Sequence, residues 1–146
     1  MPPNAHEYCL MASGGFSISM KPDTGLAPEY ILGLLNSKLL FWRLRSISNK
    51  FRGGWITCTK QYVGTLPIRV PDLAVHDRLR RHDRIVSLVR RMLDLRKRLI
   101  SANTAHERTL LERQNAATDR QIDRLVYELY ELTDAEIAVV EEAAAE

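Results

Sequence analysis

The chain has 146 residues, about one domain, and its 45% hydrophobic composition can bury a modest core without disulfides or a metal. Its net charge of +3 hides an uneven distribution, because residues 1–37 sum to −2, residues 38–98 to +12 and residues 99–146 to −7. No signal-peptide pattern and no apolar run of roughly 20 residues is present, which argues against secreted and membrane-spanning classes. We therefore expect a cytoplasmic protein.

The first part of the chain predicts strands followed by a helix. Residues 8–20 contain a turn-forming Ala-Ser-Gly-Gly stretch and then strict alternation, which is typical of a short hairpin. Pro28 fits the first turn of a helix, and apolar residues follow at spacings of three and four up to Leu44, with a break left open at residues 36–37. This helix or helix pair is apolar nearly all round, so we expect it at the centre of the core.

Residues 46–72 predict a loop and two extended segments. Residues 46–54 form a polar, glycine-ended loop, and residues 55–59 are rich in the β-branched and aromatic types that favour strands. The second extended segment, residues 66–70, contains Pro67 and is followed by Pro71, so we expect it at a sheet edge or outside the sheet. Cys9 and Cys58 have no metal-ligand spacing, and we expect both to be small buried hydrophobes. The prediction is an α+β fold with a first domain over residues 1–72.

Residues 73–146 predict a second, helical domain. Two apolar series at spacings of three and four are separated by the polar residues 101–104, which predicts an antiparallel, coiled-coil-like hairpin. The series are Ile85, Leu88, Met92, Leu95 and Leu99, then Leu111, Asn115, Thr118, Ile122, Leu125, Leu129 and Leu132. The polar Asn115 and Thr118 belong to the series that should form the seam, the line of contact between the two helices. They either set the register of the two helices, or the seam is short and hydrated at this end. Thr133 and Glu136 have capping-box spacing, so a last helix should begin there.

Most enzyme classes lack support in the sequence. There is no phosphate-binding glycine loop, no dinucleotide-binding glycine motif and no Gly-x-Ser-x-Gly elbow. The four histidines are scattered, and we interpret them as surface or satisfied side chains. Asp119 and Asp123 interleave with Arg120 and Arg124, a pattern typical of solvated pairs on an outward helix face. We therefore predict no enzyme activity, no cofactor and no metal.

The loop near residue 52 is the best candidate for a functional site. Gly53 and Gly54 permit a close backbone approach to DNA, and Arg52 has the fork that matches guanine. Lys50, Lys60 and Gln61 are candidates for phosphate or adenine contacts, with Phe51, Trp55 or Tyr62 as packing or stacking partners. The alternative is an ordinary turn, and the basic charge of the middle region is equally compatible with solvated helix faces.

Several runs together resemble one known family. Residues 30–40, 48–55 and 59–68, with residues 85–93 and 121–137, are similar to the C-terminal specificity domain of TaqI-like adenine DNA methyltransferases. The same module occurs in type IIG restriction-modification enzymes and related phage-defence methylases. The similarity extends in order over roughly residues 28–141.

This resemblance implies a target-recognition domain that places a strand-and-loop face in the major groove of double-stranded DNA, with the helices as spacer or docking surface. The methyltransferase's Asn/Asp-Pro-Pro-Tyr/Phe motif and cofactor-binding glycine motif are missing. Catalysis would therefore come from a methyltransferase subunit in trans, or the chain is a detached module. The candidate DNA-binding residues are Lys38, Arg43, Arg45, Asn49, Lys50, Arg52, Gly53, Gly54, Lys60, Gln61 and Tyr62. The alternative function is a helical interaction module that docks a methyltransferase or forms a homodimer through the hairpin.

Overall fold

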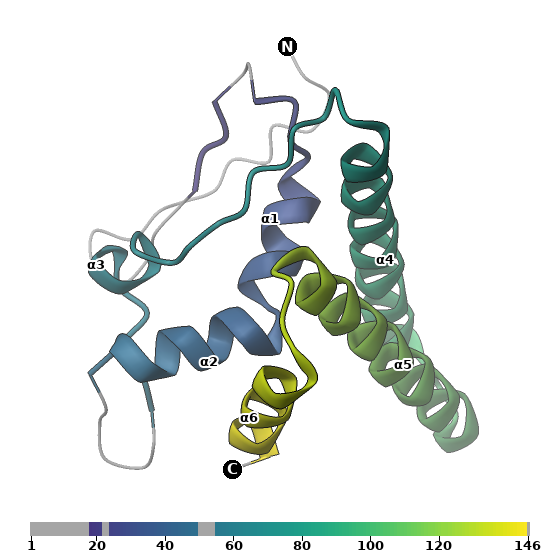
Figure 1. Cartoon of the computed structure of the whole chain (residues 1–146). Helices are drawn as coiled ribbons and strands as arrows, with labels where there is room; N and C mark the ends of the chain where they lie inside the picture. Colours follow the sequence, from purple (N-terminus) through teal and green to yellow (C-terminus); the bar gives the residue numbers. More distant parts are fainter. Residues whose placement is uncertain (1–17, 22–23, 50–54, 146) are drawn as a thin grey trace.

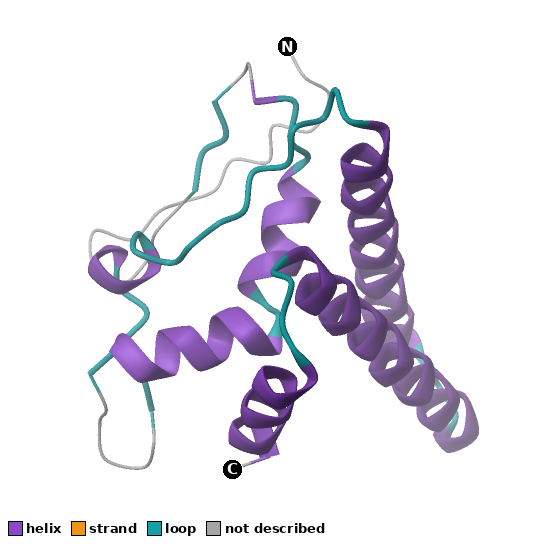
Figure 2. Ribbon diagram, in the orientation of Figure 1, coloured by secondary structure: helices purple, strands orange, loops and turns teal. Residues whose placement is uncertain are grey.

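The computed structural model describes residues 18–21, 24–49 and 55–145, which form helices joined by turns and extended segments (Figure 1). The helices of this described part are α1 (Pro28–Leu35), α2 (Lys38–Ile47), α3 (Lys60–Val63), α4 (His76–Ser101), α5 (Ala105–Leu129) and α6 (Asp134–Ala145). Figure 2 shows no strand among these residues. None of these helices is both long and apolar enough to cross a membrane.

The predicted α+β fold was wrong, because neither described segment expected to be a strand has a sheet to join. Within residues 55–59 only Ile56 takes part in an isolated bridge. Residues 66–70 are instead held by one tyrosine of α1 and one that follows α5. Tyr30 of α1 donates a hydrogen bond to the carbonyl of Arg69 at 2.8 Å, and the hydroxyl of Tyr130, just after α5, donates to the carbonyl of Pro67. The hairpin expected over residues 8–20 lies mostly outside the described residues.

The break between the first two helices is confirmed. Pro28 stands in the first turn of α1, where a missing N–H costs nothing, and α1 ends before Asn36. Ser37 then has extended backbone angles, and its hydroxyl accepts a hydrogen bond from the N–H of Leu40, so it is the N-cap of α2. The cap turns the chain from one helix into the next.

The helical hairpin is also confirmed. Residues 102–104 join α4 to α5, and the Thr104 hydroxyl caps α5 by accepting from the N–H of Glu107 at 3.1 Å. Near α1 the main core cluster contains residues of α4 and α5 such as Ile85 and Val126, together with Tyr30 and Leu34 of α1. Towards the hairpin turn, a separate small cluster contains only Leu95, Ala102 and Leu111 with Leu99 packed against it.

Helix α1 lies unusually close to α4 at Gly33. A Cβ atom at this position would be 2.8 Å from Cγ2 of Val89 and 3.0 Å from Cγ2 of Ile85. Both neighbours are buried and branched, so neither can move aside easily. Only glycine allows the two helices to pack at this distance.

The last helix begins with the predicted capping box. The Glu136 carboxylate accepts hydrogen bonds from the backbone N–H and the hydroxyl of Thr133, each at 2.8 Å. Helix α6 then packs against α2 and buries Val140 in the main core cluster. The core therefore includes residues from both predicted domains.

Candidate nucleic-acid interface

Lys38 was predicted to contact DNA, but its ammonium is engaged inside the protein. Its Nζ atom lies 2.5 Å from Oε2 of Glu141 on α6 and 3.9 Å from Oδ2 of Asp123 on α5. The hydrogen bond to Glu141 is the main reason that the pKa of Lys38 is raised above its usual value. Lys38 thus joins three helices, and a phosphate would have to compete with two carboxylates for it.

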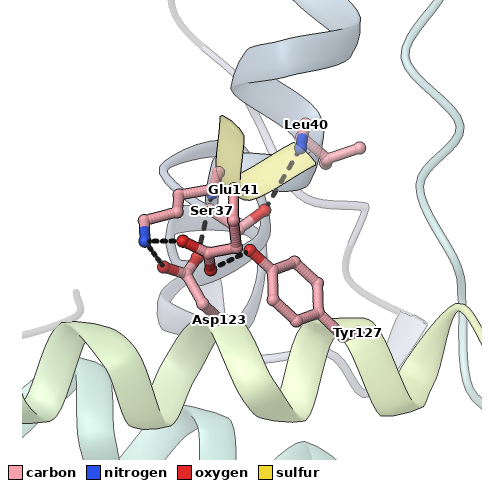
Figure 3. Close-up of polar contacts among 6 residues, drawn as sticks. Ser37, Leu40, Asp123, Tyr127 and Glu141 are labelled. Atoms are coloured by element: carbon pink, nitrogen blue, oxygen red, sulfur yellow. Dashed lines mark hydrogen bonds and ion pairs between the residues drawn. The ribbon is translucent and has the colours of Figure 1, made fainter. Parts of the chain in front are cut away.

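Asp123 is the centre of this group, and its predicted place on an outward face was wrong (Figure 3). Only 3% of the residue is exposed, and Oδ1 accepts a hydrogen bond from the backbone N–H of Lys38 at 2.9 Å. Burial raises the pKa of the Asp123 carboxyl. Tyr127, one turn further along α5, donates to Oε1 of Glu141 at 2.8 Å. We call Lys38, Asp123, Tyr127 and Glu141 the polar cluster.

Two other predicted contacts on α2 differ from each other. The guanidinium of Arg45 donates to the carbonyl of Ala143 at 3.0 Å, near the end of α6 where carbonyls lack helical partners. Arg43 is exposed and lies at the edge of an apolar groove between α2 and α6, lined among others by Trp42 and Val139. Arg43 therefore remains accessible, whereas Arg45 holds α6 in place.

The ends of the predicted recognition loop are joined at Asn49. Its carbonyl accepts from the backbone N–H of Thr57 at 3.3 Å, and the Asn49 side chain is exposed. The segment between them includes residues 50–54, so the predicted contacts Lys50, Arg52, Gly53 and Gly54 lie outside the described residues.

Beyond this closure, exposed side chains continue onto α3. Trp55 is 76% exposed, an unusual state for the largest aromatic side chain. Lys60 and Gln61 are exposed on α3, while Tyr62 is half-buried. Cys58 is also exposed, which corrects the prediction of a buried thiol.

Four of these exposed side chains, which lie close together in the sequence, are candidates for one binding surface. They are Asn49, Trp55, Lys60 and Gln61, which we call the neck surface. Within the part of the chain that the structure describes, none of the four side chains takes part in a hydrogen bond or ion pair with protein.

No family model, curated protein or solved structure matches the chain. The resemblance to the methyltransferase specificity domain therefore depends on the sequence pattern alone. Because the described residues form no sheet, they do not supply the strand part of the strand-and-loop face that this resemblance implied.

His82 and the possible metal-binding residues were the other candidates for chemistry. His82 is buried, accepts a hydrogen bond from the N–H of Ala27 at 3.3 Å and contacts Asp83, as expected for a satisfied histidine. Among residues 18–21, 24–49 and 55–145, no three His, Cys, Asp or Glu side chains are grouped as a metal site. The geometry of the described residues suits binding by hydrogen bonds and charge.

Proposed function

We propose that the chain is a DNA-recognition module that contacts duplex DNA through its neck surface. The observation that supports this proposal is the exposure of Asn49, Trp55, Lys60 and Gln61, whose side chains have no hydrogen-bond or ion-pair partner among the described residues. Side chains that stabilise a fold are normally buried or bonded, whereas these four are exposed and have no bonding partner in the described part of the chain.

Each residue type on the neck surface has a matching group on DNA. The amides of Asn49 and Gln61 can donate to and accept from the edge of adenine, which reads a base pair in the major groove. The ammonium of Lys60 suits a phosphate, which positions the protein without reading sequence. Trp55 offers a flat apolar surface for a sugar or an accessible base.

The proposal assigns no DNA contact to Lys38 or Arg45, because both bond within the protein. It retains Arg43 as an accessible positioning residue. In the proposed restriction-modification or phage-defence setting, a methyltransferase partner supplies the cofactor and the chemistry. The chain itself supplies recognition.

A titration with fluorescent duplexes tests the neck surface. Binding-site selection first gives a preferred sequence, and anisotropy then compares it with random DNA. Gln61→Ala should lose discrimination worth about 1–3 kcal/mol at one position, while Lys60→Ala should weaken both duplexes alike. Arg113→Ala is the matched control for Lys60→Ala, because Arg113 is also basic and exposed but lies on α5, outside the neck surface. If Asn49→Ala, Gln61→Ala and the control bind both duplexes like the parent, the neck surface does not read DNA.

A helical interaction module remains the second candidate function, because apolar side chains are exposed near the hairpin turn. Ile100 is 86% exposed, and Leu93 and Leu110 are also exposed. Sedimentation equilibrium tests this candidate with the parent and Ile100→Glu. A dimer that the substitution dissociates supports it, whereas a parent that stays monomeric over the whole concentration range contradicts self-association.

A further inference from the structure

The two helices of the hairpin have similar lengths but very different charges. Helix α4 contains nine Lys or Arg residues and three Asp, a net +6, whereas α5 contains four Arg and five acidic residues, a net −1. The basic residues of α4 are Arg78, Arg80, Arg81, Arg84, Arg90, Arg91, Arg96, Lys97 and Arg98, and all are exposed. Helix α5 shows how a solvated helix of this protein mixes its charges, and α4 does not follow that pattern.

Few of these basic side chains are neutralised by the protein. Arg80 pairs with Asp77 at 2.5 Å and Arg90 pairs with Glu29 at 2.9 Å. The other seven form no ion pair with a carboxylate of the described residues. Like charges three and four residues apart on a helix repel each other, so this arrangement costs stability in the absence of an anion.

Part of the charge is ordered along the helix. Arg80, Arg84, Arg91 and Arg98 follow at spacings of four, seven and seven, which places them on one side of α4. We call them the arginine row. At a rise of about 1.5 Å per residue, the row extends over about 27 Å.

The protein surface is hollowed at the N-terminal end of the arginine row. A shallow hollow at this end is lined by three arginines, two carboxylates, a serine and a leucine of α5, namely Arg80, Arg81, Arg84, Asp77, Asp83, Ser87 and Leu125. Guanidinium groups and a hydroxyl are the donors that bind phosphate oxygens. Arg81, Arg84 and Ser87 supply such donors at the hollow, whereas Arg80 is paired with Asp77 there.

We propose that the arginine row binds the sugar–phosphate backbone of duplex DNA, independently of base sequence. This inference rests on the proposed function only in that DNA is the ligand. A line of cations matches the line of phosphates on a duplex. A membrane surface fits poorly, because an interfacial helix needs an exposed apolar side and that of α4 is buried in the core.

The row forms a surface separate from the neck surface. Figure 1 shows α3, which contains Lys60 and Gln61, and α4 on opposite sides of α1, so the row and these two residues would contact different parts of a duplex. The row therefore contributes affinity and salt dependence, while the neck surface contributes sequence preference.

Two matched triple variants test the row. The first replaces Arg84, Arg91 and Arg98 by Gln, and the control replaces Arg108, Arg113 and Arg120 of α5 by Gln. Both remove three exposed positive charges, so their net charges are equal. Anisotropy titrations at several salt concentrations on random duplex DNA give the slope of log affinity against log salt. Thermal unfolding checks that both variants remain folded.

We expect the α4 variant to lower the salt slope by about 2–3 and the α5 control to change it far less. Equal slopes for the two variants overturn the inference, because net charge alone would then explain binding. An α4 variant that binds like the parent also overturns it. Gln61→Ala, titrated on both the preferred and the random duplex, reports the neck surface, so loss of sequence preference with an unchanged α4 slope rejects the row and retains the proposed function. Parent binding to anionic vesicles but not DNA overturns both.

Discussion

The carboxylate of Asp123 on α5 accepts a hydrogen bond from the backbone N–H of Lys38, the first residue of α2, which lies 85 residues away in the sequence. The first N–H groups of a helix have no partner within that helix. Ser37 satisfies one of them locally, and Asp123 satisfies another from a different element. The Lys38 side chain then binds Glu141, so the start of α2 fixes the positions of α5 and α6.

Two substitutions of Asp123 distinguish the effect of its hydrogen bond on stability from the effect of its charge. Asp123→Ala leaves the N–H of Lys38 without an acceptor in a buried place, and we expect a loss of about 1–3 kcal/mol in the free energy of unfolding. Asp123→Asn keeps an oxygen that can accept, so its loss should be smaller. Urea unfolding measures both. Equal losses for the two variants would contradict the role assigned to the hydrogen bond.

Acid stability should depend on Glu141. The hydrogen bond from Lys38 holds the pKa of Glu141 below its ordinary value of 4.5. A carboxyl with a lowered folded pKa stabilises the protein above the unfolded pKa, and that contribution disappears as pH falls through the lowered value. Glu141→Gln should therefore lose less stability than the parent below about pH 4.5, as measured by urea unfolding across the acid range. A steeper acid loss in the variant would contradict this linkage.

Asp123 should have the opposite linkage. Burial raises its pKa above the ordinary value of 3.8, so the folded protein binds a proton at a pH where the unfolded chain does not. Its contribution to stability therefore grows as pH falls from neutrality through the raised value. Asp123→Asn lacks this gain and should lose stability more steeply than the parent on acidification. Parallel pH profiles for parent and variant would show that the carboxyl is not perturbed in the folded state.

Neighbouring leucines on α5 provide a matched test of the small cluster near the hairpin turn. Leu111 is 2% exposed and packs with Leu95 and Ala102, whereas Leu110 is 50% exposed. We expect Leu111→Ala to cost about 2–5 kcal/mol and Leu110→Ala less than about 0.5 kcal/mol. Thermal or urea unfolding measures the difference. If the two variants unfold alike, the register of the hairpin is wrong.

Gly33→Ala should destabilise the protein although alanine favours helices. The gain in helix propensity is at most about 1 kcal/mol, while a methyl group forced against Val89 and Ile85 costs about 1–3 kcal/mol. A melting temperature above that of the parent would contradict the close approach of α1 to α4. Leu32→Ala, at an exposed neighbouring position, serves as the control.

The helical part of the fold follows directly from the sequence. The break before Ser37, the hairpin turn and the capping box at Thr133 were predicted because caps and apolar spacing are local signals. Asn115 and Thr118 are both buried on the seam as expected, but the amide oxygen of Asn115 has no hydrogen-bond partner. The interpretation of Asn115 as a residue that sets the register therefore stays a prediction.

The strands could not be predicted correctly from local preference. Residues 55–59 and 66–70 have strand-like composition, but a strand needs a neighbour, and no described segment supplies one. The second segment is fixed by hydroxyl groups of Tyr30 and Tyr130, contacts between elements far apart in sequence. The position of Asp123 was predicted wrongly for a related reason. Its alternation with Arg120 and Arg124 is a local pattern and gives no information on the helices that cover Asp123 in the fold.

The candidate site was predicted in part. The sequence pointed to residues 49–62, and the structure exposes Asn49, Lys60 and Gln61 there. Lys38 and Arg45 are not free in the structure, because Lys38 pairs with Glu141 and Arg45 donates to the carbonyl of Ala143, both on α6. A sequence pattern identifies a basic side chain but not the carboxylate or carbonyl with which it bonds in the folded protein.

DNA binding by the parent chain is the central claim, and its salt dependence is the most direct measurement. Anisotropy with a random-sequence duplex, repeated between about 50 and 200 mM salt, should show affinity that falls steeply and linearly on a log–log plot as bound cations are released. Binding that does not change with salt, or no binding at the lowest salt concentration, would contradict the claim.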